Sequence, residues 1–223
     1  MTPGSLLRAL LARRGAVEAP LGAGWAHELN AIRETRRLTQ LLMSDAAALQ
    51  ILIAVRAARR LGGAMAEAGV FQGGSARLIC EAKGEAPLYL FDVFETLQQP
   101  ASASGVEAEV RSHFGATYGR REQVERLLAP YPGVKFRPGV FPATTAGLEM
   151  TRFSFVHLDM DLPQSTADGL AFFHPRLLPG GILIGDDYND AGVRGAFAAY
   201  FEGRPDTLIE LPWRQVMVVR QGG

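Results

Sequence analysis

The fold of this chain is indicated first by one stretch of its sequence, Phe153-Ser154-Phe155-Val156-His157-Leu158-Asp159-Met160-Asp161. Its apolar part has the length of a buried β-strand, and two carboxylates follow where that strand would end. A second stretch repeats the arrangement after a helical pattern, Gly181-Ile182-Leu183-Ile184-Gly185-Asp186-Asp187. Because parallel strands bring their carboxyl ends to the same edge of a sheet, we expect the four aspartates to lie close together.

Four carboxylates at one sheet edge would repel each other strongly unless a cation or a shared proton neutralised them. A hard divalent metal is therefore the first hypothesis for Asp159, Asp161, Asp186 and Asp187. The alternative is that the two pairs are independent solvated loop residues, some of them capping helices. The recurrence of the pair at two consecutive strand ends favours the metal.

Outward from these strands, apolar runs of strand length alternate with helical patterns. Strands are predicted at 64–68, 88–92, 134–137, 153–158 and 181–184, and helices at 75–82, 107–114, 121–128, 165–177 and 192–201. Such alternation predicts an α/β fold, a parallel sheet with helices on both faces. Two more strand-like runs, 207–211 and 215–220, are separated by only three residues. A connection that short cannot hold a crossover helix, so we expect an antiparallel C-terminal hairpin.

The N-terminal part of the chain, residues 1–61, has a mainly helical pattern. Ser44 is predicted to cap a helix over 46–60, which Gly62 and Gly63 would end. Residues 6–14 are apolar but too short and too interrupted by arginine for a signal peptide or a membrane span. We expect 1–61 to act as a lid or in oligomerisation beside a larger domain, and 98–105 to form a mobile loop.

Composition narrows the classes of partner. Lysine plus arginine number 23, as do aspartate plus glutamate, so no net positive field attracts nucleic acid or an acidic membrane surface. The single cysteine, Cys80, excludes an intramolecular disulfide and is compatible with a reducing compartment. We therefore expect a cytoplasmic protein without nucleic-acid or membrane partners.

A glycine-rich turn follows the first predicted strand and opens a helix, Glu67-Ala68-Gly69-Val70-Phe71-Gln72-Gly73-Gly74-Ser75. Glycines allow backbone amides to approach a ligand, and a helix N-terminus favours negative charge. The spacing differs from the dinucleotide pattern G-x-G-x-x-G, which argues against NAD. Asp92 ends the second predicted strand, where an acid accepts ribose hydroxyls in nucleotide-binding folds. The glycine turn and Asp92 together predict a nucleoside ligand. The alternative is that the glycines only form a tight turn and that Asp92 only caps the following turn.

Several blocks in order along the chain resemble the macrocin O-methyltransferase (TylF-type) family, which uses S-adenosylmethionine and a divalent metal. These blocks are 67–75, 88–95, 139–144, 157–162, 165–166, 172–181 and 186–188. The resemblance extends from about 67 to 201 and departs from the family pattern at Gln72, Val93 and Pro163. It implies a Rossmann-like class I methyltransferase fold, with 62–223 as the S-adenosylmethionine-dependent catalytic domain.

The resemblance also implies roles for individual residues. Cofactor-binding residues would be Glu67 and Gly69 beside the methionine part, Gly73 and Ser75 near its carboxylate, Asp92 at the ribose and Gly139 near the adenine. Asp159, Asp186 and Asp187 would hold Mg²⁺, and Asp161 would be the general base, although Asp159 and Asp161 could exchange roles. His157 is expected to be a buried, hydrogen-bonded histidine rather than a metal ligand.

The activity implied is Mg²⁺-dependent transfer of a methyl group from S-adenosylmethionine to a hydroxyl of a sugar or glycosylated natural product. One alternative keeps the cofactor but has a catechol-type phenol as acceptor, since vicinal oxygens also chelate a metal. Another is a non-catalytic scaffold with a methyltransferase-like fold, although a scaffold has no need of four mutually repelling aspartates. Leucines in the helical N-terminal region suggest a homo-oligomer.

Overall fold

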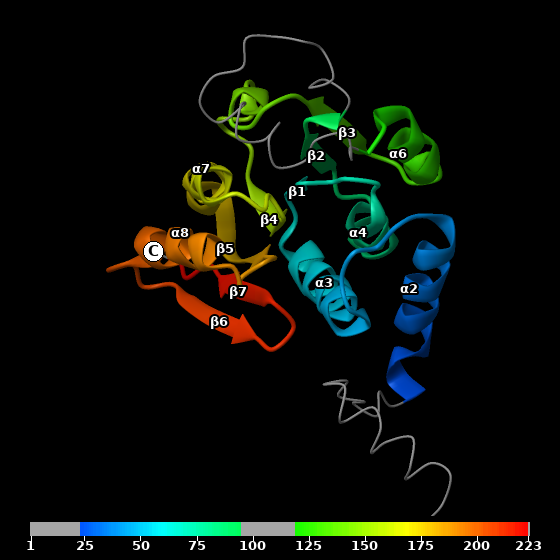
Figure 1. Cartoon of the computed structure of the whole chain (residues 1–223), viewed down its shortest axis with the longest axis horizontal. Coiled ribbons are helices and arrows are strands. Elements are labelled where there is room, and N and C mark those ends of the chain that lie inside the picture. The colour runs from blue at the N-terminus through cyan, green and yellow to red at the C-terminus, as the bar shows by residue number, and fades with distance from the viewer. Residues whose placement is uncertain (1–22, 95–118, 223) are drawn as a thin grey trace, which may run out of the picture.

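The computed structural model describes residues 23–94 and 119–222 of the 223-residue chain (Figure 1). The apolar stretch 6–14, the helix predicted at 107–114 and the mobile loop predicted at 98–105 lie outside the described residues. Among the residues that are described, no helix is long and apolar enough to cross a membrane.

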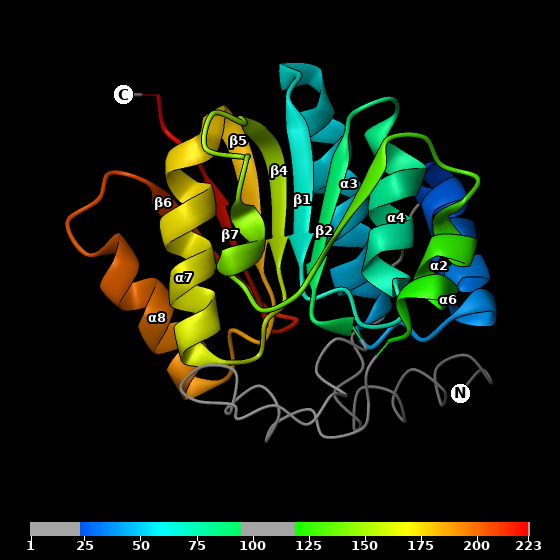
Figure 2. The ribbon, with the colours of Figure 1, turned by 90° about the horizontal axis from the view of Figure 1, so that it is seen from above.

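A seven-stranded sheet with the order β3-β2-β1-β4-β5-β7-β6 forms the centre of the molecule (Figure 2). Its strands are β1 (Ala64–Ala68), β2 (Leu88–Asp92), β3 (Val134–Pro138), β4 (Phe153–Leu158), β5 (Leu177–Gly185), β6 (Thr207–Leu211) and β7 (Gln215–Val219). The first five strands are parallel, and β7 pairs antiparallel with both β5 and β6. The predicted mostly parallel sheet with a C-terminal antiparallel hairpin is therefore confirmed.

Helices cover both faces of the sheet, as Figure 1 shows. On one face lie α2 (Ala26–Leu38), α3 (Asp45–Ala58), α4 (Gly74–Lys83) and α6 (Arg121–Leu128), and on the other α7 (Pro163–Phe173) and α8 (Ala191–Phe201). Side chains alternate along each strand, so Met65 and Phe155 enter the first core and Ala66 and Val156 the second. The helix α3 contributes Ile51 to the first core. The functional division at residue 61 stays a prediction.

The start of β5 differs from the prediction. The preceding helix ends at Phe173 and is followed by a 3-10 turn over His174–Arg176, so β5 begins at Leu177 rather than at 181. The early part of this strand contains Pro179 and Gly180, residues that are depleted in strands and concealed it in the sequence. The pairing with β4 shifts register there, as a bulge allows.

Hydrogen bonds continue past the ends of the central strands and align their carboxyl ends. Asp159 donates its amide to Ala68 at 2.8 Å, and Asp186 donates to Leu158 at 2.8 Å. Gly69 donates to Phe91 at 2.9 Å. A Cβ at Gly69, whose φ is +90°, would lie 1.6 Å from the carbonyl oxygen of Asp159. Only glycine allows β1 and β4 to end this close together.

Ser44 caps α3 as predicted, because its hydroxyl accepts a hydrogen bond from the amide of Ala47 at 3.1 Å. We expect Ser44→Ala to lower the free energy of unfolding by about 1 kcal/mol, since the amide loses its acceptor. Ser44→Asp should preserve the cap and most of the stability. Urea unfolding of both variants checks this, and equal losses in the two would contradict the capping role.

Candidate active site

A cavity of about 1350 Å³ opens at the carboxyl edge of the sheet. Its wall includes the turns after β1, β2, β3, β4 and β5, the segment 40–46 at the start of α3, and the hairpin turn 212–214. Eight predicted site residues line it: Gly69, Ser75, Asp92, Gly139, Asp159, Asp161, Asp186 and Asp187. Glu67 and Gly73 are not among its lining residues.

Asp92 fastens the glycine turn to the end of β2. One carboxylate oxygen accepts hydrogen bonds from the amides of Val70 and Phe71, at 2.7 and 2.8 Å, and the other accepts from Phe94 at 2.8 Å. Burial raises the pKa of Asp92 above its ordinary value, while these amides lower it. The amide of Val93 also hydrogen-bonds to this carboxylate, so backbone amides of four residues satisfy its charge.

The glycines of the turn serve chiefly the packing of neighbouring segments. Gly73 caps α4 with a φ of +80°, and a Cβ there would lie 2.9 Å from Val124 of α6. A Cβ at Gly74 would lie 2.5 Å from the carbonyl oxygen of Gln40. The hydroxyl of Thr39 donates to the carbonyl of Gln72 at 2.8 Å. The segment before α3 is therefore seated directly on the turn that opens α4.

Arg36 holds this segment against the cavity. Its guanidinium donates to the carbonyl oxygens of Leu41 and Met43 and to the carboxylate of Asp45. The segment 40–46 lines the cavity, where the side chain of Leu42 is 75% exposed. Sequence reasoning missed this wall because its placement depends on one arginine rather than on a motif.

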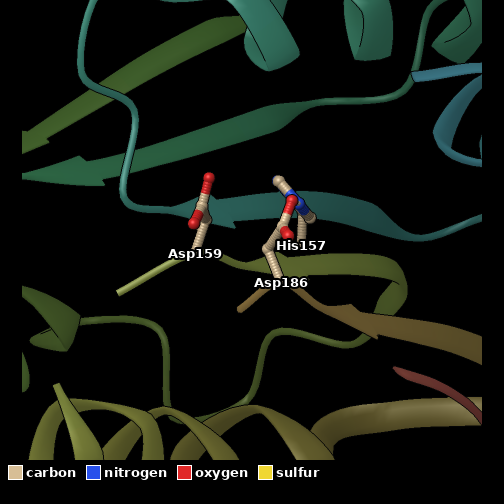
Figure 3. A group of neighbouring side chains, drawn as sticks. All are labelled: His157, Asp159 and Asp186. Carbon is tan, nitrogen blue, oxygen red and sulfur yellow. Dashed lines mark ion pairs between the residues drawn. The ribbon is translucent and has the colours of Figure 1, made fainter. Parts of the chain in front are cut away.

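The four aspartates meet as expected, in two overlapping groups. In His157–Asp159–Asp186 and in Asp159–Asp161–Asp187, one ligand atom from each residue lies within 4.8 Å of the others. Figure 3 shows the first group, which projects from the ends of β4 and β5. Asp159 belongs to both groups, so the predicted ligand set of Asp159, Asp186 and Asp187 is divided between them.

The charges in these groups are only partly compensated. Burial and the charge of Asp186 raise the pKa of Asp159 well above its ordinary value. Burial and a hydrogen bond with Asp187 raise the pKa of Asp161 to about 7. Arg214, on the hairpin turn, forms an ion pair with Asp187. Such an excess of partly buried carboxylate oxygens fits a hard divalent cation.

His157 is buried and hydrogen-bonded, as expected, and its partner is Glu67. The two face each other across β4 and β1, with His157 Nδ1 2.8 Å from Glu67 Oε1. Burial lowers the pKa of His157, but the hydrogen bond and charge of Glu67 and the nearby aspartates raise it to about 9. Glu67, expected beside the methionine part of the cofactor, is fully buried. Its contact with the cofactor stays a prediction, and its pairing with His157 could not be read without the strand order.

The strand order, with a reversed seventh strand beside the fifth, defines the class I methyltransferase fold. Solved structures agree. The O-methyltransferase NovP is 23% identical, with a TM-score of 0.65 over 79% of this chain and 80% of that one. The O-methyltransferase TomG from Streptomyces achromogenes, solved in complex with S-adenosylmethionine, is 16% identical, with a TM-score of 0.59 over 100% of both chains. At these identities the likeness concerns the fold.

Sequence comparison identifies the family. Residues 35–217 match the family described as macrocin O-methyltransferase (TylF), and the chain belongs to this family. A curated relative from Streptomyces olivaceus is 34% identical over 164 residues. It is the 8-demethyl-8-(2,3-dimethoxy-alpha-L-rhamnosyl)-tetracenomycin-C 4′-O-methyltransferase. The match covers 68% of this chain and 63% of that protein, which is less than two thirds of its length.

The arrangement at Asp92 leads to a prediction about stability. We expect Asp92→Asn to lower the free energy of unfolding by about 1–3 kcal/mol. The NH₂ group of asparagine would replace one carboxylate oxygen and would face a backbone N–H that has then lost its hydrogen-bond acceptor. Asp190→Asn is the matched control, since Asp190 caps α8 through a single oxygen that asparagine also has. Urea unfolding measures both, and equal stabilities would contradict the role of Asp92.

Proposed function

We propose that the protein is an S-adenosylmethionine- and divalent-cation-dependent O-methyltransferase that acts on a sugar hydroxyl of a glycosylated small molecule. The observation that supports this most strongly is that one cavity contains both the glycine turn with Asp92 and the four aspartates. Membership of the macrocin O-methyltransferase family supports the reaction. The relative from Streptomyces olivaceus, whose name specifies a rhamnosyl 4′-oxygen, supports a sugar as acceptor.

The cofactor would lie along the glycine turn and the ends of β2 and β3. Gly69 and Ser75 line this part of the cavity, with Ser75 in the first turn of α4. A helix N-terminus favours the carboxylate of the methionine part. Asp92 lines the cavity and is the proposed partner of the ribose hydroxyls, and Gly139 lies beside it at the end of β3. TomG, which has the same fold, binds this cofactor.

The acceptor would lie on the other side, near the aspartates. We propose Asp159, Asp186 and Asp187 as the residues that hold the cation and Asp161 as the base that takes the proton of the acceptor hydroxyl. A divalent cation held there supplies charge that lowers the pKa of a chelated hydroxyl and makes it a better nucleophile. The wall formed by 40–46, within the helical N-terminal region, would cover the acceptor and orient it for in-line transfer.

The size of the cavity supports a large acceptor. Pockets for one small ligand are about 300–1,000 Å³. The volume of about 1350 Å³ exceeds that range and leaves space for a cofactor together with a glycosylated molecule. Exposed Leu42 and the ring of Trp213, both on the wall, offer apolar surface for an aglycone.

The acceptor class can be tested with the purified chain, S-adenosylmethionine and Mg²⁺. Rhamnosylated aromatic polyketides are expected to gain one methyl group by mass spectrometry, while simple catechols remain unmodified. Turnover of catechols without turnover of glycosides would establish the phenol alternative instead. No heat on titration with S-adenosylmethionine would indicate a non-catalytic scaffold.

The proposed cation site gives a second test. We expect Asp186→Asn to lower kcat by about 100-fold or more, because a charged ligand is lost where transition-state charge is stabilised. Affinity for S-adenosylmethionine, measured by calorimetry, should be nearly unchanged. Asp190→Asn makes the same chemical change at the N-cap of α8, at a residue that does not line the cavity, and should keep its turnover. Activity that persists in excess chelator would remove the cation from the mechanism.

A further inference from the structure

A row of buried polar side chains lies directly beneath the aspartates. Glu67 on β1, His157 on β4 and Gln215 on β7 are each 0% exposed. Each also has one buried polar atom without a hydrogen-bond partner among the described residues, namely Glu67 Oε2, His157 Nε2 and Gln215 Oε1. Buried polar atoms are rarely left unpaired, because each costs about 1–3 kcal/mol. The row is therefore better explained by a function than by packing.

Asp186 is where this row meets the proposed cation site. One oxygen of its carboxylate accepts a hydrogen bond from the amide of Asp187 at 2.8 Å, and the other accepts from Gln215 Nε2 at 3.2 Å. His157 Nε2 lies 3.9 Å from that second oxygen, and Figure 3 shows the two side chains next to each other. One group from the turn after β5, one from β7 and one from β4 thus surround this carboxylate.

Glu67 fixes the orientation of the His157 ring through the ring nitrogen that does not face Asp186. Glu67 engages Nδ1 at 2.8 Å, so the ring cannot turn Nε2 away from Asp186 without breaking a buried contact. Glu67 and His157 are register partners on adjacent strands, which makes their separation a property of the sheet. Around metal sites, partners of this kind set the orientation of the ligands and contribute about 10–100-fold to metal affinity.

We propose that His157 is a positioning residue of the cation site. Clamped by Glu67 through Nδ1, it presents Nε2 to Asp186 and holds that carboxylate close to Asp159. Without it, the two carboxylates would separate by repulsion and the site would lose its preformed geometry. This inference rests on the proposed function, because it requires that the aspartates bind a divalent cation.

Two isosteric variants separate the two nitrogens of the ring. The amide of asparagine in His157→Asn reaches the position of Nδ1 and keeps the contact with Glu67, but it leaves nothing opposite Asp186. The amide of glutamine in His157→Gln reaches the position of Nε2 and keeps a donor toward Asp186. His174→Asn changes another buried histidine, which contacts Asp206 and Arg220 away from the cavity. It controls for the general cost of losing a buried imidazole.

Mn²⁺ is the probe, because its free form can be counted by electron paramagnetic resonance in a titration. We expect His157→Asn to weaken Mn²⁺ binding by about 10–100-fold, whereas His157→Gln and His174→Asn retain most of the affinity of the unaltered chain. Affinity for S-adenosylmethionine, measured in the same samples, should stay constant and so exclude a general loss of structure. If His157→Asn does not fold, Glu67→Ala, which removes the partner of Nδ1, should weaken Mn²⁺ binding instead.

Three outcomes would overturn the inference. Equal Mn²⁺ affinity in His157→Asn and the unaltered chain would show that Nε2 does not hold the site. Equal weakening in His157→Asn and His157→Gln would assign the effect to packing. A directly bound ¹⁴N signal in the spin-echo spectrum of the Mn²⁺ protein, lost in His157→Asn, would make His157 itself a ligand. Failure of the proposed function is distinguished from these, because the unaltered chain would then bind no Mn²⁺.

Discussion

The close approach of the strand ends is the constraint on which the rest of the site depends. Backbone hydrogen bonds from Gly69 to Phe91, from Asp159 to Ala68 and from Asp186 to Leu158 continue the parallel ladder past the last strand residues. Gly69 has no Cβ atom, which would otherwise collide with the carbonyl oxygen of Asp159 and prevent this close approach. Because the turns after these strands leave the sheet at the same level, the acidic residues on these turns line the same cavity.

Much of this could be predicted from the sequence. The limits of β1, β2 and β4 followed from apolar runs, and the three-residue connection before Gln215 required an antiparallel hairpin. The convergence of the aspartates followed from the rule that parallel strands end at one edge. The start of β5 could not be predicted in this way, since Pro179 and Gly180 occur in a strand only where its pairing is irregular.

What the sequence concealed depends on contacts between distant elements. Arg36 fastens the segment 40–46, and Arg214 pairs with Asp187, yet neither arginine belongs to a recognisable pattern. The pair of Glu67 and His157 is visible only when β1 and β4 are known to be neighbours in a given register. Local periodicity predicts elements, whereas these contacts arise from the order in which the elements pack.

The same residue type is used in two opposite ways at this edge of the sheet. Burial raises the pKa of both Asp92 and Asp159, but their surroundings then differ. Backbone amides offset the charge of Asp92, which thereby holds the glycine turn against the end of β2. Asp159 instead faces the charge of Asp186, which the charge of His157 only partly offsets. A buried carboxylate that the fold itself satisfies stabilises structure, while one that the fold leaves in repulsion favours an incoming cation. That difference, rather than the number of aspartates, is what separates the proposed cofactor side of the cavity from its proposed cation side.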